Sequence, residues 1–458
     1  MIKSIRRISW ASVKVALVAV SALSWPLWAS AQATKTTRQV PVESLIYDLK
    51  NPDPVRRKEA ARLLGENKVQ KATPDLVAVA QDPDLEVRRE IVVALDKMLD
   101  IRALPAFVKL SADQDKSIRD RCIVGLINLY VPQEGGLVVT LNKIANFFNP
   151  WSDEWADVVV EPDIKVDASA ITALCERLSD TDDGIRLKAA RGLGILKGKA
   201  AVPALLSALQ QDQTNAIRFE IIRSLGKIGD ASAAPDLMSY LGYNDAKVRN
   251  EAIFVIGRFR YREAVPEMMR LYEKESELPS KVIDKPFREA LLDAVAFIGD
   301  PSAKALFVKE KQSPEGALRL HAIEGLARLA DPAMVTEISR DWLHEKDPQT
   351  KTAEAYALFR MGRREYLDEV VDSLGNGKTN SEARMFLLEL KSEELPELYA
   401  QANNKDANVR EGLAEILGLV GDERAIPVLL ELSKDRRGQI TAIANQAVRR
   451  INARIARQ

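Results

Sequence analysis

The sequence predicts an all-α fold, a right-handed α-solenoid of about twelve helix-turn-helix repeats. Two observations predict it. A basic residue recurs about every 31 residues, and in most cases an acidic residue stands four positions before it. Apolar side chains follow each base at the spacing of one helix face. A fixed period in this range is typical of stacked units that cannot bury a core alone. The anchor bases are Arg57, Arg88, Arg119, Arg186, Arg218, Arg249, Arg288, Arg319, Lys351, Arg384 and Arg410, with Thr441 in the last register.

Residues 1–31 precede the repeats and have the composition of a secretory signal peptide. Four bases come before an apolar stretch at 15–23, Pro26 ends it, and Ala29-Ser30-Ala31 offers small residues for cleavage. The stretch is short for a membrane span, so a retained anchor is the less favoured alternative. We expect cleavage after Ala31, a periplasmic or secreted protein, and no integral membrane span in the mature chain.

Each repeat is predicted to contain a helix that carries the anchor base near its beginning. The acid four residues earlier stands where an N-cap accepts hydrogen bonds from the free N–H groups of the first turn. Such acids are Asp53, Asp84, Asp115, Asp182, Asp245, Asp284, Glu315, Asp347 and Asp406. Gly229, Gly299 and Gly421 follow the apolar periodicity and are predicted to end their helices in the left-handed conformation.

A second, proline-initiated helix is predicted to begin seventeen residues after the anchor. Proline suits the start of a helix because its missing N–H would be unpaired there anyway. Pro396 has the same place in a unit that is shorter by about five residues. The prolines at the regular spacing are Pro74, Pro105, Pro203, Pro235, Pro266 and Pro427.

The recurring acids and bases are interpreted as a structural ladder, in which each arginine reaches the cap acids of its own and neighbouring units. A guanidinium suits two-pronged carboxylate contacts better than a lysine does. The alternative is a basic stripe for an anionic partner. The ladder is represented by Asp84, Arg88, Asp182, Arg186, Arg218, Asp245, Arg249, Asp406 and Arg410.

These repeats resemble the short bacterial HEAT-like repeat of the phycobilisome-lyase type. The shared pattern is Asp-x-x-Val/Ile-Arg-x-x-Ala-Ala-x-x-Leu-Gly followed by the proline-initiated helix, and Asp182–Gly194 and Asp406–Gly418 fit it best. The resemblance covers about 42–130 and 168–458. It implies an armadillo-like helical fold with binding surfaces, and only a few members of that group are bilin lyases.

A long spacing between Arg119 and Arg186 marks an insertion at 131–167, which separates N-terminal repeats at 32–130 from the repeats at 168–458. Long insertions in a solenoid are usually surface loops, often at the binding edge. We predict that its aromatic residues bind a partner, and the alternative is that they fasten the loop to the stack. Its acids lack the spacing of a calcium loop. The aromatic residues are Phe147, Phe148, Trp151 and Trp155.

The sequence contains no motif that indicates catalysis, a metal site or a cofactor. Its only histidines, His321 and His344, are interpreted as surface or packing residues. No paired-cysteine motif or phosphate-binding loop is present. Cys122 and Cys175 either form a disulfide in an oxidising compartment or serve as small apolar residues. We therefore expect no cofactor and no enzyme activity.

Charge excludes one class of partner. The mature chain would keep 62 of the 66 bases, since four lie in the leader, against 66 acids. This balance argues against a nucleic-acid binder. Arg191, Arg223 and Arg258 are expected near the exposed side of successive anchor-bearing helices, which would line the inner curve of the array. We predict that they form a shallow basic strip that binds a partner, an acidic protein or a glycan.

We expect an exported, non-enzymatic scaffold that binds a protein partner in the cell envelope. One alternative is a polysaccharide- or peptidoglycan-binding module in which Trp151 and Trp155 stack on sugar rings. Another is a relative of the lyases with a chaperone-like role. The oligomeric state is open.

Overall fold

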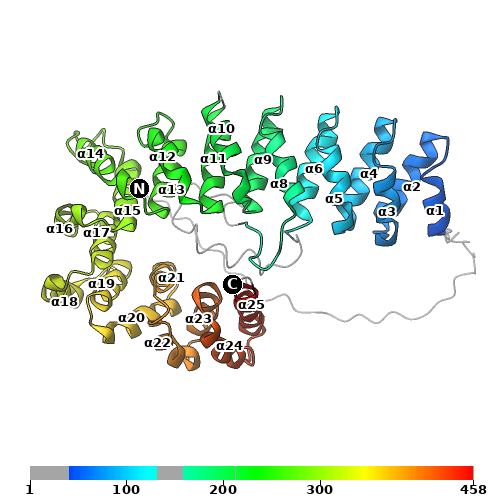
Figure 1. Cartoon of the computed structure of the whole chain (residues 1–458). Coiled ribbons are helices and arrows are strands. Elements are labelled where there is room, and N and C mark those ends of the chain that lie inside the picture. The colour runs from blue at the N-terminus through cyan, green and yellow to red at the C-terminus, as the bar shows by residue number, and fades with distance from the viewer. Residues whose placement is uncertain (1–40, 132–157, 212, 457–458) are drawn as a thin grey trace, which may run out of the picture. The chain divides into compact units, whose positions relative to one another are not determined.

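The computed structural model describes residues 41–131, 158–211 and 213–456. Within these ranges every regular element is a helix, as the repeat pattern predicts. Figure 1 shows the helices in successive pairs along residues 42–455. The leader and the insertion aromatics Phe147, Phe148, Trp151 and Trp155 lie outside the described residues. No described helix is long and apolar enough to span a membrane.

Twelve helices carry the anchor register, and they form one row of the array. Consecutive members of this row pack against one another, and α6 contacts α9 directly across the predicted insertion. The row consists of α2 (Pro54–Glu66), α4 (Leu85–Met98), α6 (Lys116–Asn128), α9 (Asp183–Ile195), α11 (Asn215–Ile228), α13 (Ala246–Arg258), α15 (Lys285–Ile298), α17 (Gly316–Leu329), α19 (Pro348–Arg360), α21 (Asn380–Leu388), α23 (Ala407–Val420) and α25 (Gly438–Ile455).

The other helices cover the outside of that row. Of the twelve that the structure describes, nine begin at a 3-10 turn and seven have proline in the first two positions, as predicted for Pro74, Pro203 and Pro427. They are α1 (Val42–Asp48), α3 (Thr73–Ala78), α5 (Leu104–Leu110), α8 (Ala168–Arg177), α10 (Val202–Gln210), α12 (Ala234–Leu237), α14 (Val265–Ser276), α16 (Lys304–Glu310), α18 (Val335–His344), α20 (Leu367–Asp372), α22 (Pro396–Tyr399) and α24 (Ile426–Leu432).

Short 3-10 helices join the two rows. Nine precede an outer helix, and η5, η10 and η11 extend the short helices α12, α20 and α22. Their bounds are η1 Gln70–Ala72, η2 Ile101–Ala103, η3 Lys199–Ala201, η4 Ala231–Ala233, η5 Met238–Tyr240, η6 Arg262–Ala264, η7 Pro301–Ala303, η8 Pro332–Met334, η9 Arg364–Tyr366, η10 Ser373–Gly375, η11 Ala400–Asn403 and η12 Glu423–Ala425.

The predicted N-caps are present in most units. Asp84, for example, accepts a hydrogen bond from the backbone N–H of Val87 at 3.0 Å. Glu315 is an exception, because its side chain makes no capping bond to α17. Thr214 replaces the acid before α11 and caps through its hydroxyl. A cap of this kind stabilises a helix by about 1 kcal/mol.

The prediction of left-handed glycines is correct for two of the three positions. Gly229 and Gly299 have φ of 78° and 66°. Gly421 is extended instead, with φ −67° and ψ 152°. Glycine is needed there for space, since a Cβ atom would stand 2.3 Å from the carbonyl oxygen of Leu417.

Residues 158–167 connect two distant parts of the array. The N–H of Val160 donates to the carbonyl of Ile195 at the end of α9. The carboxylate of Glu161 accepts two hydrogen bonds from Arg450 of α25, at 2.6 and 2.8 Å. Arg450 is buried. We call residues 158–167 the strap, because this segment forms hydrogen bonds with both α9 and α25.

Candidate functional site

The arginine ladder exists, but its partners differ from those predicted. Arg88 donates from Nε to Asp113 at 2.8 Å, and its Nη1 bonds the carbonyls of Asp82 and Pro83. Asp113 stands two residues before the cap acid Asp115, not at the cap itself. The same pattern joins Arg57 to Asp82, Arg119 to Asp180 and Arg410 to Asp435. Each base thus ties one unit to the next through an acid that the cap pattern does not include.

The remaining ladder residues vary around this theme. Arg249 reaches the cap acid Asp284 of the following unit at 2.6 Å. Arg186 bonds Gln213 and Asp183, and Arg218 bonds the backbone carbonyl of Gln213. Asp182, Asp245 and Asp406 all cap their helices. These contacts fit the interpretation of the ladder as structural, and that role stays a prediction.

The three arginines expected near an exposed face are largely covered. Arg223 is buried, with its guanidinium 4.3 Å from the centre of the Phe219 ring. Arg191 pairs with the buried Glu220 at 2.9 Å. Arg258 is half-buried between aromatic rings, and burial lowers its pKa. The proposed basic strip is therefore much less exposed than the sequence suggested, and its role in partner binding stays a prediction.

Arginine side chains instead converge on Phe297 of α15. The guanidinium carbons of Arg258, Arg260 and Arg328 lie 4.2, 5.1 and 4.7 Å from the centre of that ring. Cations are attracted to the face of an aromatic ring in this geometry. Arg258 comes from α13 and Arg328 from α17, so three successive units contribute to one cluster.

Glu389, which follows α21, balances this positive charge. Its carboxylate pairs with Arg328 at 2.7 Å and with Arg260 at 3.2 Å. Burial alone would raise the pKa of Glu389, but the neighbouring arginines, Arg328 above all, lower it. Residues 260 and 389 are far apart in sequence, so the anchor-bearing helices α13 to α21 converge at this cluster. This agrees with the expectation that they line the inner side of the array here.

His321 lies next to this cluster and is buried, so of the two expected roles, surface or packing, the surface role is excluded. It is 8% exposed on α17, and its Nδ1 atom lies 3.1 Å from the carboxylate of Glu324. Asp293 and Glu289 of α15 flank the same ring. Burial would lower the pKa of His321, but these three carboxyl groups raise it. His344 is exposed, as expected.

A signal for these buried charges was present in the sequence. The position five residues after the anchor faces the convergent side, and it changes sign along the chain. It is occupied by Arg191 and Arg223 in two early units and by Asp293, Glu324, Glu389 and Glu415 in later ones. The periodicity of the apolar residues does not reveal this row, because its members are polar.

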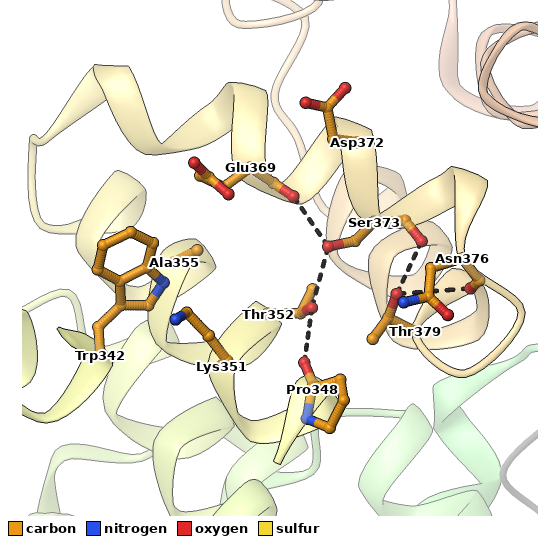
Figure 2. Close-up of a pocket in the computed structure, with 10 residues that line it drawn as sticks. All are labelled: Trp342, Pro348, Lys351, Thr352, Ala355, Glu369, Asp372, Ser373, Asn376 and Thr379. Atoms are coloured by element: carbon orange, nitrogen blue, oxygen red, sulfur yellow. Dashed lines mark hydrogen bonds between the residues drawn. The ribbon is translucent and has the colours of Figure 1, made fainter. Parts of the chain in front are cut away.

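A pocket of about 270 Å³ lies between α18, α19 and α20. Figure 2 shows Lys351 beside the ring of Trp342 on one side and Glu369 and Asp372 on the other. The Lys351 ammonium is 4.7 Å from the centre of the indole ring, and Trp342 packs edge-on against Tyr366. Thr352 and Ser373 are joined across the floor by a 3.0 Å hydrogen bond.

The same place in two other units holds a paired anchor. Hollows between successive units are lined by Arg88 with Asp113 and by Arg119 with Asp180. In the Trp342 pocket the anchor is a lysine, and among the described residues no carboxylate forms an ion pair with it. The pocket is thus a place in the array where the ladder is interrupted. Asn376 stands at the position of the acid, and Lys351 lies against the ring of Trp342 instead.

Both cysteines are free thiols in the structure. Cys122 is buried in α6 and Cys175 is half-buried in α8. Burial raises the pKa of both thiols. Of the two readings of these residues, the structure shows the small apolar one.

Comparison with known families supports the repeat assignment. A family model for HEAT repeats matches residues 42–127 and 171–245. A model for the PBS lyase HEAT-like repeat matches residues 409–435. The chain is a HEAT-like repeat protein. Folds built from HEAT-like repeats are typically scaffolds for protein–protein interaction and are generally not enzymes. No curated protein matches the chain.

Solved structures that match the chain are distant in sequence. An engineered protein is 18% identical, with a TM-score of 0.41, over 90% of this chain and 98% of its own. A structure from work on the phosphorylation-controlled interaction between cadherin and beta-catenin is 11% identical, with a TM-score of 0.35, over 90% and 99%. Importin beta is 12% identical, with a TM-score of 0.42, over 92% and 66%. At these TM-scores the similarities add no argument.

Proposed function

We propose that the protein is an exported, non-enzymatic scaffold that binds a protein partner in the cell envelope. The HEAT-like repeat array supports a binding role, and the Trp342 pocket is the observation that carries it. Tryptophan is enriched among the residues that dominate binding energy at protein interfaces. Trp342 is half-buried and lies beside Lys351, an anchor that forms no ion pair among the described residues, unlike Arg88 and Arg119.

The pocket offers different chemistry on its two sides. Trp342 and Lys351 present an aromatic face with a positive charge beside it, and the exposed Glu369 and Asp372 present negative charge opposite. The hydroxyl groups of Thr352, Ser373 and Thr379 already donate to one another or to backbone carbonyls. A partner segment would therefore place an apolar side chain on the indole ring and its charged groups on the two walls.

The test is capture of a partner from envelope extract by the purified protein, with quantitative mass spectrometry of what is retained. We expect one dominant partner that Trp342→Ala loses about tenfold or more, since a central interface tryptophan contributes about 2 kcal/mol or more. Leu343→Ala is the matched control, because Leu343 is the adjacent residue of α18 and is 67% exposed. Melting curves must show that both variants fold.

Retention of the same partner by wild type and Trp342→Ala would contradict a role for this pocket. Dependence on Arg191 or Arg223 instead would move the binding surface to the anchor-bearing row. Substrate turnover by the purified protein would contradict the non-enzymatic part of the proposal.

Export rests on the composition of residues 1–31, which includes a basic start, an apolar stretch and the Ala29-Ser30-Ala31 triplet. We expect the mature protein to begin at Gln32. Intact-mass measurement on protein recovered from the periplasm or the medium checks this. A product that keeps Met1 and separates with membranes would replace the soluble scaffold with an anchored one.

A further inference from the structure

The cluster around His321 brings together groups from two successive units. His321 and Glu324 lie one turn apart on α17, and Asp293 lies on α15. A ring nitrogen of His321, one carboxylate oxygen of Asp293 and one of Glu324 all lie within 4.8 Å of one another. The Nδ1 atom of His321 is 3.1 Å from Glu324 and 3.5 Å from Asp293.

These separations match the edges of a metal coordination sphere. Zinc binds imidazole nitrogen and carboxylate oxygen at about 2.0–2.2 Å, so neighbouring ligands around a tetrahedral ion stand about 3.3–3.6 Å apart. Both carboxylates approach the same ring nitrogen, Nδ1, which leaves one shared place for a cation between the three groups. An imidazole with two carboxylates suits zinc and related first-row divalent ions.

Glu289 occupies the position of a supporting residue. Its carboxylate oxygen lies 3.8 Å from Nε2, on the opposite edge of the imidazole ring. Histidines that bind metals usually donate the proton of the second nitrogen to a carboxylate, which fixes the ring and the tautomer. Glu289 is therefore a carboxylate on the side of the imidazole ring where a residue that orients a metal-binding histidine is expected.

Charge balance is compatible with a bound cation. Glu289, Asp293, Glu324 and Glu389 bring four negative charges, and Arg258, Arg260 and Arg328 bring three positive ones. Arg328 and Arg260 are both engaged by Glu389. Arg328 also lies 4.0 Å from Glu324. Burying an unmatched carboxylate is costly, so the His321 end of the cluster needs one further positive charge, which either a protonated His321 or a bound cation supplies.

Access from solvent is provided on one side. The side chains of Glu289 and Asp293 are 49% and 26% exposed, whereas that of Glu324 is 1% exposed. An ion can thus enter past α15 and reach the buried ligands on α17.

We propose that Asp293, His321 and Glu324 form a binding site for one divalent transition-metal ion of the zinc class, with Glu289 holding the imidazole. The ion would link α15 to α17 and thereby join two successive repeats. It would also neutralise the two carboxylates that face Nδ1. The site is independent of the Trp342 pocket, so either proposal can fail without the other.

The test uses the purified full chain after removal of metals with a chelator. Zinc titration by calorimetry should show one site per chain, and cobalt should give the visible absorption bands of a nitrogen- and oxygen-coordinated ion. Zinc should also raise the melting temperature, because a ligand that binds only the folded state stabilises it. Magnesium and calcium should not replace zinc.

His321→Gln should abolish both the zinc stoichiometry and the cobalt spectrum. Asp293→Asn, at a more exposed position, should weaken zinc binding at least tenfold and keeps the test valid if the first variant does not fold. His344→Gln is the matched control, since it removes the only other histidine and should bind zinc as wild type does.

Absence of stoichiometric binding by wild type would overturn the proposal and leave a protonated His321 as the counter-charge. Unaltered binding in folded Asp293→Asn and His321→Gln would overturn it too, because the ion would then lie elsewhere. Preference for calcium or magnesium over zinc would likewise contradict a site that includes an imidazole ligand.

Discussion

Glu354 of α19 is a carboxyl group in a place that disfavours its charge. It is 3% exposed, and its Oε2 atom has no hydrogen-bond partner among the described residues. Burial raises the pKa of Glu354 to about 8, and the charges of Glu345 and Asp341 add to this. The folded chain therefore holds a proton on Glu354 that the unfolded chain releases at lower pH.

The raised pKa of Glu354 makes the stability of the folded protein depend on pH in a defined direction. Because the folded pKa lies above the ordinary value, the contribution of Glu354 is fully present below about pH 4.5 and is lost as pH rises toward 8. We expect Glu354→Gln to melt about 1–3 °C above wild type at pH 8, with little difference at pH 4.5. Melting curves across pH 4–9 measure it.

Glu393→Gln is the control, since Glu393 is exposed. A Glu354→Gln variant that is less stable than wild type at every pH would show that the carboxylate is ionised and paired in the folded protein.

The helices themselves were predictable because their signals are local. The acid that caps α4, the proline that begins α10 and the glycine that ends α11 each act within one turn. Helix ends were less predictable, because Leu99, Lys197, Arg260 and Ala330 adopt the left-handed conformation without being glycine. A residue other than glycine in this conformation leaves no signal in the local sequence pattern.

The ties between repeats were only half predictable. A recurring arginine indicates a recurring partner, but the sequence does not say which of two nearby acids it reaches. Asp113 and Asp115 both precede α6. In the packed array Arg88 pairs with Asp113, and Asp115 caps α6.

The His321 cluster was not predictable from element-level patterns. Its groups come from α15 and α17, about thirty residues apart in sequence, and single-helix periodicity treats each of them as an isolated polar interruption. Only the packing of consecutive anchor-bearing helices brings Asp293 to Nδ1 of His321. Contacts between units cannot be predicted from the periodicity of one sequence.

At the scale of the whole array, the strap is the contact with the greatest reach. Glu161 and Arg450 are 289 positions apart, and Gln446 also bonds Glu161 at 3.1 Å. The stability of a repeat array is otherwise close to a sum of units and nearest-neighbour interfaces. The strap adds a term that this sum does not contain.

We expect Arg450→Ala and Glu161→Gln each to destabilise the protein by about 1.5–3 kcal/mol, the usual range for hydrogen bonds to charged groups. The double variant should cost little more than either single one, because both remove the same interaction. Denaturant unfolding of the four proteins measures the coupling. Arg449→Ala is the matched control, since Arg449 is the exposed neighbour of Arg450.

Fully additive costs would contradict a direct link between the two side chains. Loss of the C-terminal units to protease in Arg450→Ala, with the preceding units intact, would show that the strap mainly protects the last repeats.

Mechanically, the strap gives the array two load paths. A row of helices joined only to its neighbours behaves as a spring, in which small changes at each junction add up to a large extension. A second link from residue 161 to residue 450 bears tension in parallel with every junction between α9 and α25. The intervening repeats then share one limit on extension, and a pull that separates them must break the ion pair of Glu161 and Arg450 before the spring can lengthen freely.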